Sequence, residues 1–226
     1  MLKRIIQLGS IAAVALLLTA PARAATVIDF QTNGAGMGGW LTWDGSNLTG
    51  TNIPIGVVTI TQAPTNNGTY SVYGSATGTG SHGPGGGNMF GDLDFATGPG
   101  SFITLAGCIP GLSVGVFDPV TGTCSTTAVL LSGSITQFDN SQASNGLISA
   151  SGLDTKNATL LAAIGLPANT PFAFFGFSLA TNALGPDQGS SAISTDIRNT
   201  AVPEPASLML LGTGLLALCR IRRRTV

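Results

Sequence analysis

AVLLSGSITQF, residues 128–138, is the stretch that decides the fold class, because apolar and hydroxyl side chains alternate along it. The apolar residues that would share one face of an extended strand are Val129, Leu131 and Ile135. The hydroxyl residues that would share the other face are Ser132, Ser134 and Thr136. A period of two residues is typical of a half-buried β-strand.

The same alternation returns twice near the C-terminus. In residues 172–179 the shared face is formed by Phe175, Phe177 and Leu179. In the last segment Ile193, Thr195 and Ile197 would point inward, and Ser194, Asp196 and Arg198 outward. Further strands are expected at residues 26–30, 39–43, 55–61, 69–73, 88–95 and 101–105. Short strands separated by Gly, Pro and Asn predict a mainly β fold, an antiparallel β-sandwich or jelly roll.

Two segments depart from this pattern. Asp154 or Thr155 is expected to cap one short helix that runs to about Ile164 and ends at Gly165. Residues 74–91 contain eight glycines and formally a G-x-G-x-x-G at residues 78–83, but Pro84 follows where a dinucleotide-binding fold needs a helix. We therefore expect a loop there, of the kind that contacts partners, and no nucleotide site.

Residues 1–24 have the three parts of a secretory signal peptide. Lys3 and Arg4 form the basic start, residues 5–19 form the apolar region, and Ala22 and Ala24 frame an A-x-A cleavage signal. Export with cleavage after Ala24 is the expected outcome.

The C-terminal segment, residues 202–226, also has three parts. Its polar motif consists of Val202, Pro203, Glu204 and Pro205, and its basic cluster consists of Arg220, Arg222, Arg223 and Arg224. The prolines keep the motif extended and accessible to a processing enzyme. The apolar run between them, residues 206–219, would span about 21 Å of a ~30 Å hydrocarbon core, which suits a temporary transmembrane helix. The arginines act as the membrane stop and place the C-terminus in the cytoplasm, so the preceding chain would lie outside.

Between these signals, residues 25–199 are long enough for one exported domain with a core. Lys156 and Arg198 are its only basic residues against nine aspartates, a net charge of −7. We do not expect nucleic acid as a partner, because phosphate binding needs clustered Lys and Arg.

Cys108 and Cys124 are the only cysteines of this domain, and the chain between them is rich in turn-forming residues. In an oxidising compartment we expect them to form a disulfide. The alternative is a pair of free thiols in the core. A metal site is disfavoured because no histidine or further cysteine completes it.

The domain offers little from which to build an enzyme. His82 is the only histidine and no G-x-S-x-G accompanies it. Asp92 and Asp94 would share one face of a strand, but a glycoside hydrolase needs one carboxyl group with a raised pKa, which the sequence does not reveal. We therefore predict no catalytic residue, no cofactor and no resident metal, and rank glycoside hydrolysis third among the functions.

Two binding hypotheses stay open. Calcium would suit oxygen ligands near turns, and the candidates are Asp92, Asp94, Asp118, Asp139 and Asp187. No EF-hand spacing is present, and ordinary turn-forming aspartates are the simpler interpretation. Trp40 and Trp43 are three residues apart, as are Tyr70 and Tyr73, so one member of each pair would be buried while the other is free to hold a sugar ring.

The motif at residues 202–207, the Leu- and Gly-rich run and the arginine cluster together resemble the PEP-CTERM sorting domain, whose usual companion is a signal peptide. The resemblance implies processing by an exosortase in the inner membrane of a Gram-negative bacterium, besides the signal peptidase. It also implies delivery to the cell surface or the exopolysaccharide matrix. We thus expect a structural or interaction protein of a biofilm or envelope, with exopolysaccharide as a candidate partner. The alternative is a carbohydrate-binding module, assisted by calcium or not.

Overall fold

The computed structural model describes residues 25–32, 38–75, 90–139, 146–181 and 188–201, which belong to one unit, Ala25–Val202. The side chains at 174–176, 181 and 188–193 are not among those described. The expected signal peptide, the C-terminal segment, His82 with most of its glycine-rich loop, and Asp187 lie outside the described residues.

The described residues form thirteen strands, one short α-helix and one 3₁₀ helix. The first seven strands are β1 (Val27–Gln31), β2 (Gly38–Trp43), β3 (Leu48–Ile55), β4 (Val57–Thr61), β5 (Gly68–Ser71), β6 (Gly91–Ala96) and β7 (Phe102–Gly107). The remaining elements are η1 (Pro110–Leu112), β8 (Val116–Asp118), β9 (Thr123–Thr126), β10 (Ala128–Asp139), β11 (Leu147–Lys156), α2 (Ala158–Ala163), β12 (Phe172–Thr181) and β13 (Gln188–Ala201). The predictions of a mainly β fold and of one short α-helix are confirmed.

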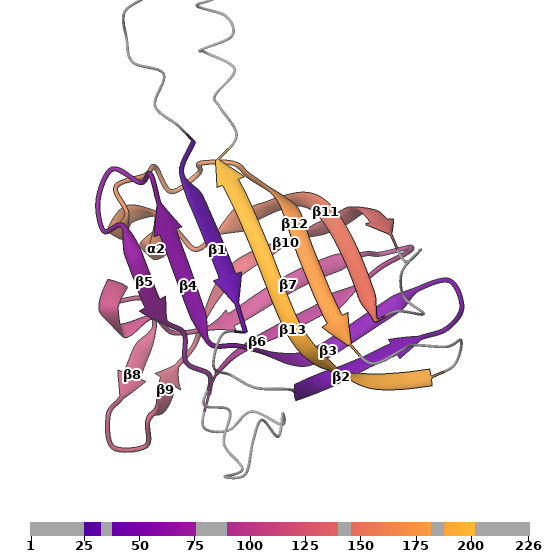
Figure 1. The fold of residues 1–226 in the computed structure, drawn as a ribbon. Coiled ribbons are helices and arrows are strands. Elements are labelled where there is room, and N and C mark those ends of the chain that lie inside the picture. The colour runs from indigo at the N-terminus through magenta and orange to yellow at the C-terminus, as the bar shows by residue number, and fades with distance from the viewer. Residues whose placement is uncertain (1–24, 33–37, 76–89, 140–145, 182–187, 202–226) are drawn as a thin grey trace, which may run out of the picture. The chain divides into compact units, whose positions relative to one another are not determined.

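Eleven strands form one sheet in the order β12-β11-β10-β7-β6-β3-β2-β13-β1-β4-β5, and a further pairing of β12 with β13 closes eight of them into a ring. The long strand β13 makes this possible, because its first half pairs with β2 and its second half with β1, while β12 runs along its other edge. Figure 1 shows β4, β1, β13 and β12 side by side. The large sheet is continuous and is not divided into two facing sheets by its pairings, so the sandwich or jelly-roll layout is not confirmed.

The strand at 128–138 exists as β10, but its alternation is interrupted. Leu131 and Ile135 are buried as predicted, whereas Val129 is 50% exposed and Leu130 is fully buried in its place. The cause is a β-bulge, since the register with β7 shifts between Val129 and Leu131. The predicted inward position of Val129 is therefore wrong.

The two C-terminal strands follow their predicted alternation where their side chains are described. Phe177 and Leu179 are buried in β12, and Thr195 and Ile197 are buried in β13. Ser194 and Arg198 are exposed. Phe177, Leu179 and Ile197 belong to the hydrophobic core cluster of the domain, and Thr195 is buried as a polar residue.

The helix begins later than predicted. Asn157 is its N-cap, and its side-chain oxygen accepts hydrogen bonds from the backbone N–H groups of Thr159 and Leu160 at 2.9 and 3.2 Å. Asp154 and Thr155 lie instead in β11, a strand that the sequence pattern did not predict. The end at Gly165 is confirmed, where φ is +80°.

The turn between β4 and β5 holds the C-terminus of α2. The Ala163 carbonyl accepts hydrogen bonds from Asn66 Nδ2 at 2.7 Å and from Thr65 Oγ1 at 3.1 Å. These side chains satisfy a carbonyl at the helix end that has no partner within the helix itself.

Candidate functional site

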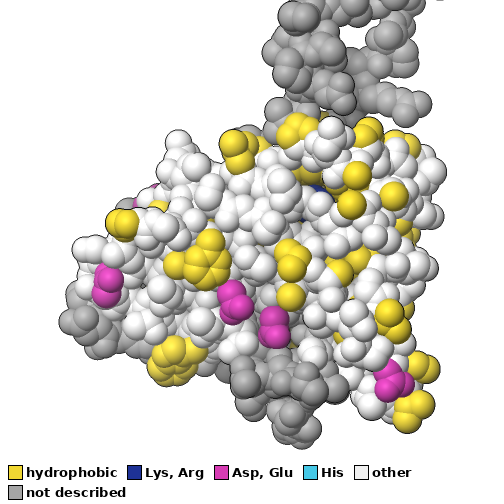
Figure 2. Space-filling view, turned by 180° about the vertical axis from the view of Figure 1, so that it is seen from behind, with side chains coloured by type: hydrophobic (Ala, Val, Ile, Leu, Met, Phe, Trp, Pro, Cys, Tyr) yellow, Lys and Arg dark blue, Asp and Glu magenta, His cyan; other side chains and the backbone are white. Residues whose placement is uncertain are grey.

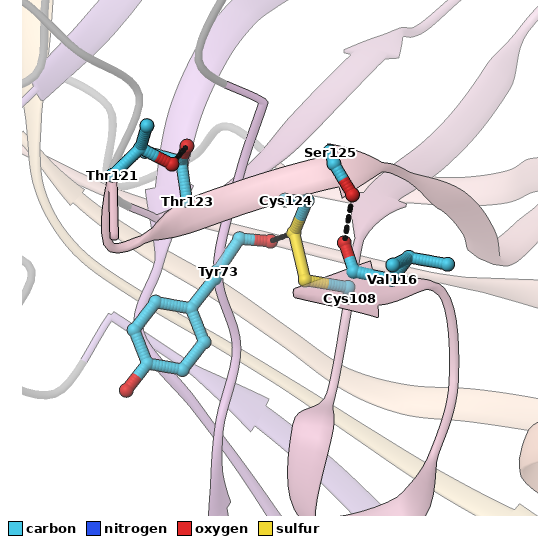
Figure 3. The surroundings of a disulfide bond; sticks show 7 residues. All are labelled: Tyr73, Cys108, Val116, Thr121, Thr123, Cys124 and Ser125. Atoms are coloured by element: carbon cyan, nitrogen blue, oxygen red, sulfur yellow. Dashed lines mark hydrogen bonds between the residues drawn. A yellow bond between two sulfur atoms is a disulfide. The ribbon is translucent and has the colours of Figure 1, made fainter. Parts of the chain in front are cut away.

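The disulfide predicted between Cys108 and Cys124 is present, with the two Cα atoms 6.0 Å apart. Cys108 follows β7, and Cys124 lies in β9 of the separate β8–β9 hairpin (Figure 3). Tyr73 exchanges two backbone hydrogen bonds with Cys108, at 3.0 and 2.9 Å, and the Cys124 N–H donates to the Gly74 carbonyl at 2.7 Å. The bridge therefore fastens the hairpin to the large sheet where three segments meet.

Side-chain contacts support the same junction. The rings of Tyr73 and Phe117 lie with their centroids 4.5 Å apart. Cys124 Sγ lies 3.0 Å from the Tyr73 carbonyl oxygen, a close contact without a hydrogen because the sulfur is bonded to its partner (Figure 3). The hairpin tip is exposed, with Val120 at 92%.

Asp118, one of the candidate calcium ligands, has a local role in this hairpin. Its Oδ1 accepts a hydrogen bond from the Val120 N–H at 2.8 Å, and this bond lowers the pKa of the carboxyl group. It thus behaves as a turn-forming aspartate. No group of three His, Cys, Asp or Glu residues that could hold a metal ion occurs in the described part of the chain.

The tryptophans divide as predicted, since Trp43 is 7% exposed and Trp40 is 55% exposed on the outer face of β2. Trp43 instead packs inward, with its ring centroid 6.1 Å from that of Phe138. Tyr70 and Tyr73 do not separate in this way, because both are partly buried.

Trp40 stands at one end of a row of polar side chains that crosses six strands. It pairs with Thr51 of β3, the next residue Asn52 contacts Asp94 of β6, and the row continues to β11. The further members, in strand order, are Thr104, Ser132 and Thr155. Asp92 and Asp94 share the outer face of β6, as predicted, and Asp94 Oδ1 accepts a hydrogen bond from the Asn52 N–H at 2.8 Å. We call this set, from Trp40 to Thr155, the hydroxyl row.

The face drawn in the space-filling view carries little charge. Figure 2 shows a few acidic side chains and scattered exposed apolar ones on a largely white surface. Such a surface presents hydroxyl and amide groups rather than clustered charge.

A pair of carboxyl groups that sequence reasoning missed lies on the outer face of β1 and β13. Asp29 pairs with Arg198, and Asp196 pairs with Gln31 one step along the ladder. Burial, followed by the hydrogen bond and the charge of Asp29, raises the pKa of Asp196 to about 7. Gln31 Nε2 donates to Asp29 Oδ2 at 2.8 Å, which orients the second carboxyl group.

Two neighbouring carboxyl groups, one with a raised pKa, are the kind of pair that acid–base catalysis uses, but catalysis also needs a place for a substrate. The structure shows a shallow hollow of about 260 Å³ on β10 and β11. Its lining consists of Gln137, Phe138, Asp139, Ser149, Ala150 and Ser151. Neither Asp29 nor Asp196 borders it. No sequence signal announced this pair, because the partners lie on strands from opposite ends of the domain.

The domain, with its disulfide and its single closed sheet, leads directly into a segment of the kind that directs the sorting of exported proteins. Residues 201–224 match the family model described as the PEP-CTERM protein-sorting motif. This match confirms the resemblance. It includes the Val202–Pro205 motif and all four arginines of the basic cluster, whose individual roles stay predictions.

No curated protein and no solved structure matches the chain. Among the residues that the structure describes, no helix is long and apolar enough to cross a membrane. The sorting motif implies an exported protein that is anchored through its C-terminus until an exosortase processes it.

Proposed function

We propose that this protein is a structural or interaction component of the cell surface or exopolysaccharide matrix of a Gram-negative bacterium. It reaches that place through cleavage of its signal peptide after Ala24 and exosortase processing of its C-terminal segment. The observation that carries the proposal is the sorting motif at residues 201–224. We assign the domain no catalytic role.

Two features of the domain support an extracellular location. Its one disulfide joins a hairpin to the sheet, and disulfides persist in oxidising compartments. The segment between the two terminal signals carries a net charge of −7 with few charged residues in all, so its surface suits hydrated polymers better than polyanions.

The test is fractionation of an exosortase-bearing, exopolysaccharide-producing host that expresses the full chain. We expect the protein in the surface and matrix fractions, and a Pro203→Ala/Pro205→Ala variant in the membrane fraction, unprocessed. Pro99→Ala, in the exposed turn between β6 and β7, is the matched control and should behave as the unaltered protein. Equal distribution of all three proteins would contradict the proposal.

The hydroxyl row favours a second candidate function, carbohydrate binding. An exposed indole beside hydroxyl groups provides a flat apolar surface for a sugar ring and hydrogen-bond partners at its rim. Trp40 and Thr51 supply these two elements on neighbouring strands. Whether calcium assists carbohydrate binding is tested separately, by repeating the binding assay in the presence of a chelator.

Affinity electrophoresis in gels that contain the host exopolysaccharide tests this candidate. Trp40→Ala should weaken binding about tenfold or more, which is about 1.4 kcal/mol or more of binding free energy. Val116→Ala removes an apolar side chain of similar exposure, 54%, from the separate hairpin and serves as the control. If the chain does not bind, or if both variants bind equally well, carbohydrate binding at this face is ruled out.

A further inference from the structure

Three polar side chains lie in the interior of the sheet, where apolar residues are the rule. Asp154 and Lys156 are the last two inward positions of β11 and are 5% and 6% exposed, and Asn199 of β13 is fully buried. Charged residues are seldom buried to this degree unless they are paired or functional. Neither the sorting motif nor the proposed surface role uses them.

The side chains of Asp154 and Asn199 both contact the amine nitrogen of Lys156, Nζ. This nitrogen donates a hydrogen bond to Asn199 Oδ1 at 3.0 Å and lies 2.6 Å from Asp154 Oδ2. The Phe172 ring lies against it, with the centroid 5.0 Å away. Apart from this ion pair, neither carboxylate oxygen of Asp154 finds a hydrogen-bond partner in the described part of the chain.

The carboxamide of Asn199 is held in a fixed orientation. Its Nδ2 donates to the backbone carbonyls of Ile28 and Ile197 at 3.0 and 2.8 Å, so its oxygen faces Lys156. The amine and the carboxamide are thus held against each other in the buried interior, and such fixed proximity is how a protein makes an intramolecular reaction fast.

Burial also shifts both pKa values toward the neutral forms that the reaction needs. It lowers the pKa of Lys156 to about 8, with the charge of Asp154 opposing the shift, and it raises the pKa of Asp154. Both directions favour a neutral amine beside a neutral carboxyl group over an ion pair. A neutral lysine amine is a nucleophile, and a carboxyl group next to it can give and take protons.

We propose that Lys156 and Asn199 react with each other inside the folded domain and form an intramolecular isopeptide bond, with Asp154 as the proton-transferring group. The Nζ lone pair attacks Cγ of Asn199 and forms the new C–N bond. Asp154 gives a proton to Nδ2 and receives one from Nζ. The Cγ–Nδ2 bond breaks, and ammonia leaves. One amide replaces another, so no oxidant, cofactor or energy source is required.

The bond would tie together elements that are distant in the chain. Lys156 ends β11 and Asn199 lies near the end of β13, just before the sorting motif starts at residue 201. A covalent link here would close the sheet against unfolding from its C-terminal strand. The inference does not depend on the proposed function.

The mass of the purified full chain, denatured and reduced, is the direct test. We expect it to lie below the mass of the processed sequence by one ammonia, about 17 Da, because amide formation from an amine and a carboxamide expels that molecule. Succinimide formation at an Asn-Gly bond such as Asn67-Gly68 would give the same loss, so the bond must also be located.

Trypsin locates it, because the domain contains only two cleavage points, Lys156 and Arg198. In the cross-linked protein, cleavage after Lys156 is blocked and the peptide that begins at Asn199 stays attached. In the protein without the bond, three separate peptides appear: one ends at Lys156, one ends at Arg198, and the third begins at Asn199. The full sequence mass together with these three peptides would overturn the proposal, whatever the variants do.

The variants then assign the roles. Lys156→Met and Asp154→Asn should each show the full mass of their own sequence, whereas Arg198→Met, which alters the exposed basic residue, should keep the deficit. A deficit that persists in Lys156→Met would overturn the assignment of the bond. One that persists in Asp154→Asn would overturn the role of Asp154 in proton transfer.

Discussion

Removal of the disulfide should destabilise the domain by an amount that follows from the loop it closes. The cysteines are separated by 16 residues, and closing a loop of this length removes entropy from the unfolded chain worth about 3 kcal/mol. Unfolding entropies near 2.1 cal/mol/K per residue convert this into a fall in melting temperature of about 8 °C for the Ala25–Val202 unit. Because both cysteines are buried, Cys108→Ala/Cys124→Ala is the suitable variant.

Scanning calorimetry with and without a reductant measures this loss. The reductant should bring the melting temperature of the unaltered protein down to that of the double variant, and it should leave the variant itself unchanged. Chymotryptic cleavage at Phe117 under native conditions should also become faster, since the bridge holds the β8–β9 hairpin on the sheet. A double variant that melts within about 2 °C of the unaltered protein would refute the reasoning from loop entropy.

Three further changes test other parts of the structure by calorimetry. Asn157→Ala removes the N-cap of α2 and should cost about 1 kcal/mol, and an unchanged melting temperature would contradict the capping role. The raised pKa of Asp196 makes folding bind a proton, so the stability of the unaltered protein should fall as the pH rises from about 4 to about 7 and level off above. Asp196→Asn should flatten this pH dependence and, after allowance for solvent screening, stabilise the protein by about 1 kcal/mol near neutral pH. A pH profile of stability that the substitution leaves unaltered would contradict the assigned role of Asp196. Gly133→Ala places a Cβ 2.3 Å from the Leu153 carbonyl oxygen and should lower the free energy of unfolding by about 2 kcal/mol or more. Gly122→Ala meets open space at φ +71° and should lower it by about 1 kcal/mol. Equal losses of stability in the two variants would contradict the steric argument.

The sequence revealed those features that depend on local pattern. Ile197 and Leu131 were placed in the core because apolar and polar residues alternate around them, and the disulfide followed from the presence of only two cysteines in the exported segment. The sorting motif was recognised because it is a linear signal.

The errors arose where one residue or one distant contact changed the pattern. The bulge before Leu131 moved Val129 to the surface, and no composition rule announces a bulge. The strand β11 was missed because its inward positions change from Ile148 and Ala150 to Asp154 and Lys156, which breaks the apolar period.

The chemically most informative groups depend on long-range pairing. Asp29 meets Asp196, and Lys156 meets Asn199, only because β13 pairs with β1 and β12 and closes the ring. Neither pair shares a local motif, so the sequence alone could not bring them together.

The central claim, that the chain is exported and then released from its membrane stop by processing, is tested most directly by the C-terminus of the mature protein. The protein recovered from the surface of an exosortase-bearing host should lack the arginine cluster at residues 220–224, and its mass should place the new C-terminus within residues 201–219. A mature protein that still ends at Val226, or one that is shortened identically in a host without an exosortase, would contradict the account.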